Sequence, residues 1–133
     1  VAYSTDAGEP TEVFHNRLRE RYDSGESAVL AAMERFVSLT EEAVAACQQG
    51  DVARLHRLMD ENYDTRASIC RLPVEHVAMI EAARSTGASA KFAGSGGAIV
   101  GCCHDDAMFN RLGEALSPLG CRVITPSIAE PFV

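Results

Sequence analysis

The sequence feature that most constrains the fold of this chain is a pair of short apolar segments separated by a glycine-rich stretch. Segments 88–92 and 98–103 have the residue pattern of β-strands, and the five residues between them, 93–97, include three glycines. Glycine adopts positive φ values that other residues avoid, so such a stretch reverses the chain direction easily. The sequence therefore predicts a β-hairpin, and any fold assigned to the chain must contain two adjacent antiparallel strands at this place.

The rest of the pattern predicts a strand near each end and five helices. Apolar residues at spacings of three and four mark the helices, Gly50 ends the second of them, and Asp51 begins the third. Pro73 suits the first turn of the fourth helix, and Asp105 and Asp106 suit the positive end of the fifth. The expected elements are strand 1–4, helices 14–22, 29–49, 52–63 and 73–86, strands 88–92 and 98–103, helix 105–119 and strand 121–125.

This order of elements is βαββαβ, with four helices in the first crossover. It predicts an α+β fold, a ferredoxin-like sandwich in which an enlarged helical layer covers one face of a four-stranded, mainly antiparallel sheet. A chain of 133 residues with 47% hydrophobic residues is sufficient for one globular domain, so we expect a single domain over 1–133.

The glycine stretch is longer than a turn requires, because a hairpin loop is ordinarily about two residues long. The backbone N–H groups of Gly94, Ser95, Gly96 and Gly97 are candidates for a concave, anion-binding nest. The alternative is a plain turn without a ligand. Lys91 stands close to this stretch and is a candidate source of positive charge for a phosphate site, or else a polar residue of an edge strand.

Arginines and cysteines give the remaining candidates. Arg66 and Arg71 follow the expected third helix, and a guanidinium binds a carboxylate or phosphate bidentately, although a solvated helix end explains them as well. Cys102, Cys103 and His104 are metal-ligand types. Neighbouring strand residues point to opposite faces, however, so we expect no metal site. No residue of the chain is a candidate catalytic acid or base.

Composition excludes several classes of partner. The net charge is −7 and no cluster of Lys and Arg occurs, so we expect no nucleic-acid partner. No apolar run approaches the roughly 20 residues that span a bilayer, so we expect no membrane insertion. The five cysteines lack the spacing of a disulfide framework, which predicts free thiols and a cytoplasmic location.

Residues 87–98, Gly-Ala-Ser-Ala-Lys-Phe-Ala-Gly-Ser-Gly-Gly-Ala, resemble the third, C-terminal motif of the GHMP kinases, the galactokinase, homoserine kinase, mevalonate kinase and phosphomevalonate kinase family. The opening strand and segments 13–19, 50–66 and 82–87 are also similar to the C-terminal half of that family. Within the family, Asn-Tyr-Asp-Thr-Arg at 62–66 and the glycine motif look most like glucuronokinase-type sugar kinases. Ala93 departs from the motif, which often has Thr or Ser there, so one hydroxyl contact is missing.

The resemblance implies a nucleotide-binding, ATP-dependent phosphotransferase for a sugar or sugar acid such as glucuronate. Its active site would lie between two domains. This chain would be the C-terminal domain, and an N-terminal domain, in the same polypeptide or a separate chain, would bind most of the ATP and Mg²⁺. Gly94, Ser95, Gly96 and Gly97 would approach the transferred phosphoryl group and the substrate. The chain alone is expected to be catalytically incomplete. A non-catalytic small-anion-binding or regulatory module, or a structural subunit of a two-chain enzyme, are the alternatives.

Overall fold

The computed structural model describes the backbone of residues 1–4 and 11–127. The side chains that it describes are those of residues 1–4 and 17–127. Its strands are β1 (Ala2–Ser4), β2 (Lys91–Phe92), β3 (Ala98–Val100) and β4 (Cys121–Val123). Within this described part they form a four-stranded sheet in the order β2-β3-β1-β4, and every neighbouring pair is antiparallel. This topology confirms the predicted α+β fold.

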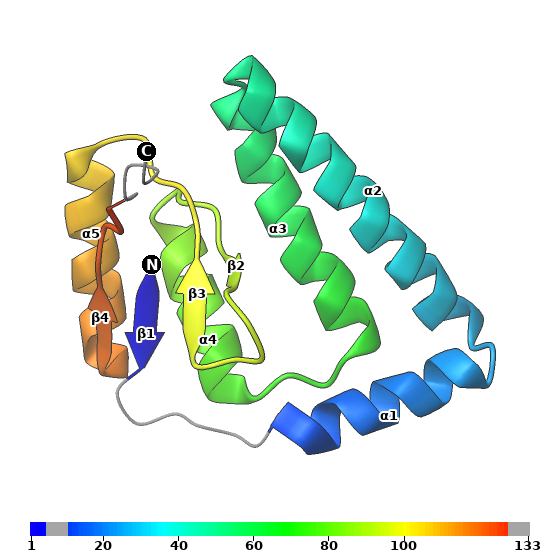
Figure 1. The fold of residues 1–133 in the computed structure, drawn as a ribbon. Coiled ribbons are helices and arrows are strands. Elements are labelled where there is room, and N and C mark those ends of the chain that lie inside the picture. Colours follow the sequence, from blue (N-terminus) through cyan, green and yellow to red (C-terminus); the bar gives the residue numbers. More distant parts are fainter. Residues whose placement is uncertain (5–10, 128–133) are drawn as a thin grey trace, which may run out of the picture.

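The helices are α1 (Thr11–Asp23), α2 (Ser27–Gln49), α3 (Val52–Ile69), α4 (Val74–Ser85) and α5 (Asp106–Leu116), and a 3₁₀ turn, η1, follows at Ser117–Leu119. In Figure 1, α4 and α5 lie behind the strands, while α2 and α3 run side by side beyond β2, and α1 crosses below them. We call the four strands with α4, α5 and η1 the sheet half, and α1–α3 the helical arm. Among the described helices, none combines the length and apolarity that crossing a membrane would require.

The corners between helices follow the predicted capping signals. Gly50 has a left-handed conformation at φ 67°, and its N–H bonds to the carbonyls of the last turn of α2. The Asp51 carboxylate then accepts a hydrogen bond from the Arg54 N–H at 2.9 Å and so caps α3. Asp105 caps α5 in the same way, through the Met108 N–H at 2.7 Å. Local side-chain chemistry therefore sets where these helices start.

The sheet half encloses the larger core. Register places Ala2, Ile99 and Phe92 in one row across three strands, and all three side chains are buried beneath α4 and α5. Ile80 and Leu116, each 1% exposed, are the helix residues most deeply buried against this row. Burial of this apolar face is what attaches the two helices to the sheet.

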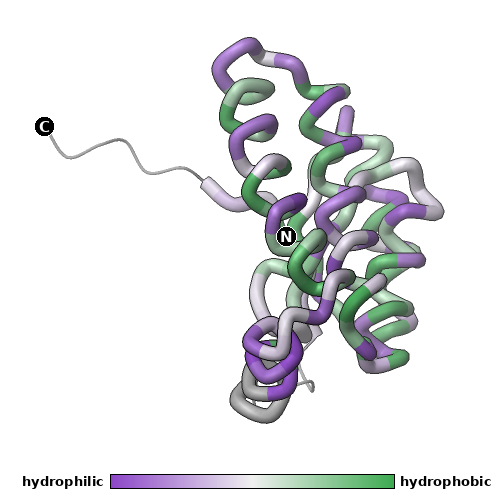
Figure 2. The backbone as a smooth tube through the Cα atoms, turned by 90° about the vertical axis from the view of Figure 1, so that its right-hand side faces the viewer, coloured by the Kyte–Doolittle hydropathy of each residue, from purple (hydrophilic) through white to green (hydrophobic). Residues whose placement is uncertain are grey.

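The helical arm is held differently. Tyr63 of α3 belongs to the core of the sheet half, and the other buried side chains of the arm form two small clusters, Val29, Ala32 and Ile69 in one and Leu39, Ala46 and Leu58 in the other. Between them, Arg35 on α2 reaches Glu61 on α3 at 2.6 Å and Glu42 at 2.8 Å. Figure 2 shows hydrophilic and hydrophobic residues interleaved along these helices, as expected where each helix buries only a stripe.

Several boundaries differ from the prediction, and three of these differences lie near the glycine loop. The helix expected over 52–63 continues to Ile69, because Ile69 itself is buried and extends the apolar stripe, so Arg66 lies inside α3 and not beyond it. The strands expected over 88–92 and 98–103 are regular only at Lys91–Phe92 and Ala98–Val100. Beyond these strands the Ser89 N–H still bonds to the Cys102 carbonyl at 3.3 Å, but the Cys102 N–H bonds to the Ser89 side-chain oxygen at 3.1 Å, so the backbone ladder is not continued. Gly101 approaches Ser89 there so closely that a Cβ would stand 1.8 Å from the Ser89 carbonyl oxygen.

Candidate functional site

The glycine loop, residues 93–97, connects β2 to β3 as predicted. The Ala93 N–H bonds to the Ala98 carbonyl at 3.0 Å and closes the hairpin, and the Ser4 N–H bonds to the Gly97 carbonyl at 2.9 Å. Gly96 and Gly97 have φ values of 155° and 72°. Both values favour glycine, so this path of the chain depends on those two residues.

Arg66 reaches the loop from α3. Its guanidinium donates to the Gly94 carbonyl at 2.6 Å and to the Ser95 carbonyl at 2.9 Å, and it lies 5.0 Å from the centre of the Phe92 ring. Burial lowers the pKa of this guanidinium. The sequence made Arg66 a candidate contact for a substrate carboxylate or phosphate. In the structure two of its N–H groups bind loop backbone, which makes Arg66 an organiser of the loop.

The position of Arg66 decides where two loop N–H groups point. A trans peptide is planar, with its N–H directed opposite its C=O. Because the carbonyls of Gly94 and Ser95 face Arg66, the N–H groups of Ser95 and Gly96 point away from it. Adjacent N–H groups on one side of a loop create a partial positive charge that suits an anion.

Lys91, the only lysine of the sequence, precedes the loop on β2. Its ammonium donates to the Phe92 carbonyl at 3.1 Å, and within the described residues it forms no ion pair. Burial, followed by the charge of Arg66, lowers its pKa. Successive strand residues face opposite sides, so Lys91 lies on the other face of β2 from Phe92. A partly buried cation without a carboxylate partner favours a bound anion.

His76, in the first turn of α4, supports the loop from beneath. It is 4% exposed, and its ring lies edge-on to Phe92 with 6.0 Å between ring centres. A Cβ on Gly96 would stand 2.4 Å from His76 Nδ1, so the imidazole occupies the space that any other residue would need. The sequence predicted no role for His76. His76 precedes Ile80 by four residues and Ala83 by seven, and this helical spacing could have predicted that His76 is buried on the same face of α4.

A pocket of about 420 Å³ opens beside the loop, on the side of Arg66. Its walls come from all three arm helices and from the loop: Leu18, Phe36, Asn62, Arg66, Ile69, Cys70, Gly94 and Ser95. These described lining residues include no carboxylate. The pocket lies on the opposite side of the loop from the Ser95 and Gly96 N–H groups, and its lining offers a magnesium ion no oxygen-anion ligand.

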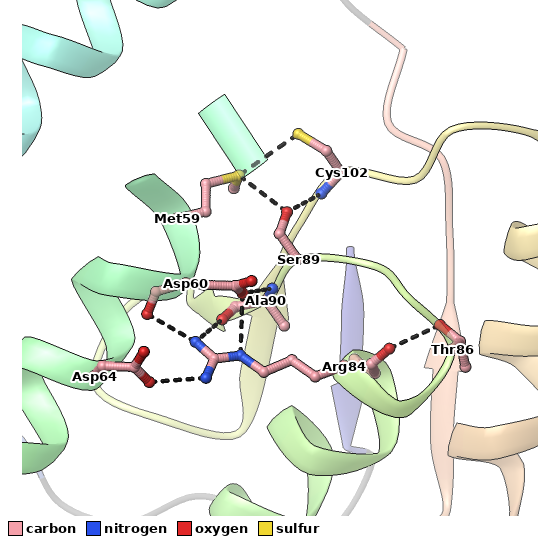
Figure 3. A network of polar contacts seen from close by, with 9 residues as sticks. Met59, Asp60, Asp64, Arg84, Thr86, Ser89, Ala90 and Cys102 are labelled. Atoms are coloured by element: carbon pink, nitrogen blue, oxygen red, sulfur yellow. Dashed lines mark hydrogen bonds and ion pairs between the residues drawn. The ribbon is translucent and has the colours of Figure 1, made fainter. Parts of the chain in front are cut away.

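The acidic residues of α3 are used structurally. Asp60 forms an ion pair with Arg84, with 3.0 Å between Oδ1 and Nε, and it accepts a hydrogen bond from the Ala90 N–H at 2.9 Å. Asp64 accepts a hydrogen bond from Arg84 at 2.7 Å. Figure 3 shows this network joining α3 to α4 and to the segment before β2. It fixes the helical arm to the sheet half beside the glycine loop.

The cysteine and histidine candidates lie away from the loop. Cys102 Sγ lies 3.5 Å from Met59 Sδ, and Cys103 is exposed. His104 stacks on His56 with 4.4 Å between ring centres, and burial, followed by the charge of His104, lowers the pKa of His56. Arg71 is exposed beyond the end of α3. None of these residues contributes to the glycine loop.

Comparison with known proteins identifies the class. The family model for the GHMP kinases C terminal matches residues 43–118, which include α3, α4, the glycine loop and α5. This chain belongs to the GHMP kinase C-terminal family.

Two curated relatives are similar in sequence. The "Probable glucuronokinase 2" of Arabidopsis thaliana is 38% identical over 95 residues, and "Glucuronokinase 1" of the same plant is 37% identical over 95 residues. Each alignment covers 68% of this chain but 26% of the relative, so the chain spans about a quarter of the length of these proteins.

One solved structure has the same fold. The crystal structure of L. major mevalonate kinase in complex with R-mevalonate matches 88% of this chain and 37% of that protein, with a TM-score of 0.79 and 22% sequence identity. Most of this chain therefore shares its fold with part of that protein.

Proposed function

We propose that this chain is the C-terminal domain of an ATP-dependent kinase that phosphorylates a sugar or sugar acid, with glucuronate as the first candidate. The observation that carries the proposal is the glycine loop, whose Ser95 and Gly96 N–H groups are turned away from Arg66. Beside it lies the partly buried Lys91, which forms no ion pair with any described residue. Family membership and the similarity to two glucuronokinases support the choice of substrate class.

In this proposal the loop residues Gly94, Ser95, Gly96 and Gly97 contact the transferred phosphoryl group and the acceptor. Lys91 neutralises charge on that group, and Arg66 holds the loop carbonyls so that the N–H groups stay in place. Phosphoryl transfer depends mainly on positioning and on stabilisation of charge, which are the contributions such a loop provides. Ala93 lacks a hydroxyl, so backbone groups carry the contact.

ATP would supply the phosphoryl group, and Mg²⁺ would accompany its phosphates. From the resemblance to the GHMP kinases, we assign the Mg²⁺ ligands and the catalytic acid–base residues to an N-terminal domain that packs against this one. We also propose a cytoplasmic location, which the five free thiols support.

The test uses the intact polypeptide that carries this sequence. ADP formation is measured with ATP, Mg²⁺ and a panel that includes glucuronate, other sugar acids and neutral sugars. We expect activity with a sugar acid, and a loss of about tenfold or more in Lys91→Met because one stabilising charge is removed. Gly113→Ala, in α5 with nothing within 4 Å of the new methyl group, is the control.

Two outcomes would contradict the kinase proposal. A folded, intact polypeptide that forms no ADP with any sugar would exclude it. If that protein nevertheless bound inorganic phosphate through Lys91, the small-anion-binding module would be the better description.

A further inference from the structure

We propose that His76 is a positioning residue of the glycine loop, and that its Nδ1–H donates a hydrogen bond to the Gly96 carbonyl when the loop binds an anion. The inference rests on the proposed function, because it describes how the same loop responds to a phosphate group. It adds a residue that is 20 positions away in sequence and that touches neither phosphate nor sugar.

The first observation is an unpaired polar atom. His76 is 4% exposed, and within the described part of the chain its Nδ1 has no hydrogen-bond partner. A buried polar atom without a partner is costly, and such atoms are rare in folded proteins. Nδ1 also lies directly against Gly96, where a Cβ would come within 2.4 Å of it. The partner that Nδ1 lacks is therefore expected in the loop.

The second observation concerns the loop carbonyls. Those of Gly94 and Ser95 accept from Arg66, and that of Gly97 accepts from the Ser4 N–H. The structure records no hydrogen bond to the Gly96 carbonyl among its described residues. This carbonyl and the Gly97 N–H belong to one peptide unit, with a glycine on each side. Glycines allow that unit to rotate at little cost.

Rotation of this peptide unit would give the Gly96 carbonyl a hydrogen bond from His76 and would direct the Gly97 N–H toward the anion. Arg66 and His76 both contact Phe92, so both lie on the face of β2 to which that ring points. If the Gly96 carbonyl turns toward His76, the Gly97 N–H turns to the opposite side. It then joins the N–H groups of Ser95 and Gly96, and three successive N–H groups make a deeper anion nest. His76 thereby couples its own hydrogen bond to the binding of a phosphate.

Two substitutions separate this role from simple packing. His76→Leu fills the space without a donor, whereas His76→Asn keeps an N–H donor close to the position of Nδ1. In the intact polypeptide we expect His76→Leu to weaken binding of inorganic tripolyphosphate about tenfold, which is the effect of one lost hydrogen bond, and His76→Asn to recover most of the affinity. Equal weakening in both variants, with equal thermal unfolding midpoints, would overturn the inference.

Nitrogen NMR of ¹⁵N-histidine-labelled protein provides the second readout. The sequence has four histidines, and His76→Asn assigns the signal by its disappearance. Saturation with tripolyphosphate should move the His76 Nδ1 resonance into the protonated, hydrogen-bonded range. If tripolyphosphate binds and this resonance stays in place, the inference fails while the proposed function stands. If tripolyphosphate does not bind the unaltered protein, both fail.

Discussion

The sheet half and the helical arm are stabilised by different forces. The sheet half encloses one continuous core, in which Ile80, Leu116 and Phe92 are packed between the sheet and two helices. The arm has two small clusters, and its helices are joined by ion pairs such as Arg35 to Glu61, whose side chains remain 34% and 46% exposed. Exposed ion pairs contribute little, so most of the stability is expected in the sheet half.

The glycine loop lies where these two regions meet. Arg66 of the arm holds its carbonyls, while His76 of the sheet half supports it from beneath. We therefore expect the loop to keep its conformation only while the helical arm is packed against the sheet half. We therefore expect that a substitution in the arm can change the conformation of the glycine loop without unfolding the sheet half.

The largest expected effect tests the difference between the two cores. Leu116 and Leu39 are 1% and 2% exposed, so Leu116→Ala and Leu39→Ala delete the same atoms at equal burial. We expect a loss of about 4 kcal/mol in the free energy of unfolding for Leu116→Ala and about 2.5 kcal/mol for Leu39→Ala, because a small cluster collapses more easily around a cavity. Urea denaturation measures both, and equal losses would remove the distinction.

The next effect concerns the support beneath the loop. Gly96→Ala places a methyl group against the His76 ring at a φ of 155°, and we expect a loss of about 2 kcal/mol in unfolding free energy from clash and strain. Gly94→Ala meets nothing within 4 Å, and we expect less than about 0.5 kcal/mol. Thermal unfolding compares them. Similar stabilities would show that Gly96 is not fixed against the sheet half.

A smaller effect is expected at the junction itself. Asp60→Asn removes the ion pair with Arg84 and weakens the hydrogen bond from the Ala90 N–H, and we expect a loss of about 1.5 kcal/mol in the free energy of unfolding. Asp64→Asn, at a side chain that is 60% exposed, is the matched control with a loss below about 0.5 kcal/mol. Urea denaturation of both variants provides the comparison. If Asp64→Asn lowers the free energy of unfolding as much as Asp60→Asn does, the Asp60 contacts are not what joins the helical arm to the sheet half.

The smallest effect is an acid sensitivity of the arm. Hydrogen bonds from Arg35, and then from Arg54, hold the pKa of Glu42 below its ordinary value of 4.5, and Arg35 does the same for Glu61. Since the folded-state pKa is the lower one, this stabilisation is complete above about pH 4.5 and disappears as the pH falls through the folded-state pKa.

Circular dichroism during thermal unfolding between pH 6 and pH 3.5 measures this loss. We expect the midpoint to fall with acidification, and to fall less in Arg35→Gln because its glutamates start closer to their ordinary pKa. A variant with unchanged acid dependence would mean that these ion pairs do not stabilise the arm.

Local patterns were sufficient to predict the elements of both regions. Gly50, Asp51 and Asp105 act on backbone groups within a few residues, so their effects are visible in the sequence. The glycine loop was equally visible, because its excess glycines are adjacent. The order βαββαβ then led to the correct sheet topology.

The contacts that shape the loop could not be predicted in this way. Arg66 reaches carbonyls 28 and 29 residues away, and Asp60 accepts from the N–H of a residue 30 positions away. Such pairings depend on how the arm docks on the sheet half, and no sequence spacing reports that geometry. His76 was missed for the same reason: its partner Gly96 becomes a neighbour only when α4 packs beneath the hairpin.

We propose that the glycine loop binds phosphate through its backbone N–H groups, and amide hydrogen exchange of residues 94–97 can detect this binding. The exchange is measured in the intact polypeptide with and without ATP, Mg²⁺ and glucuronate. We expect the amides of Ser95, Gly96 and Gly97 to exchange more slowly when all three are present. If exchange at these amides is unchanged while the protein turns over ATP, the loop does not bind phosphate in this way.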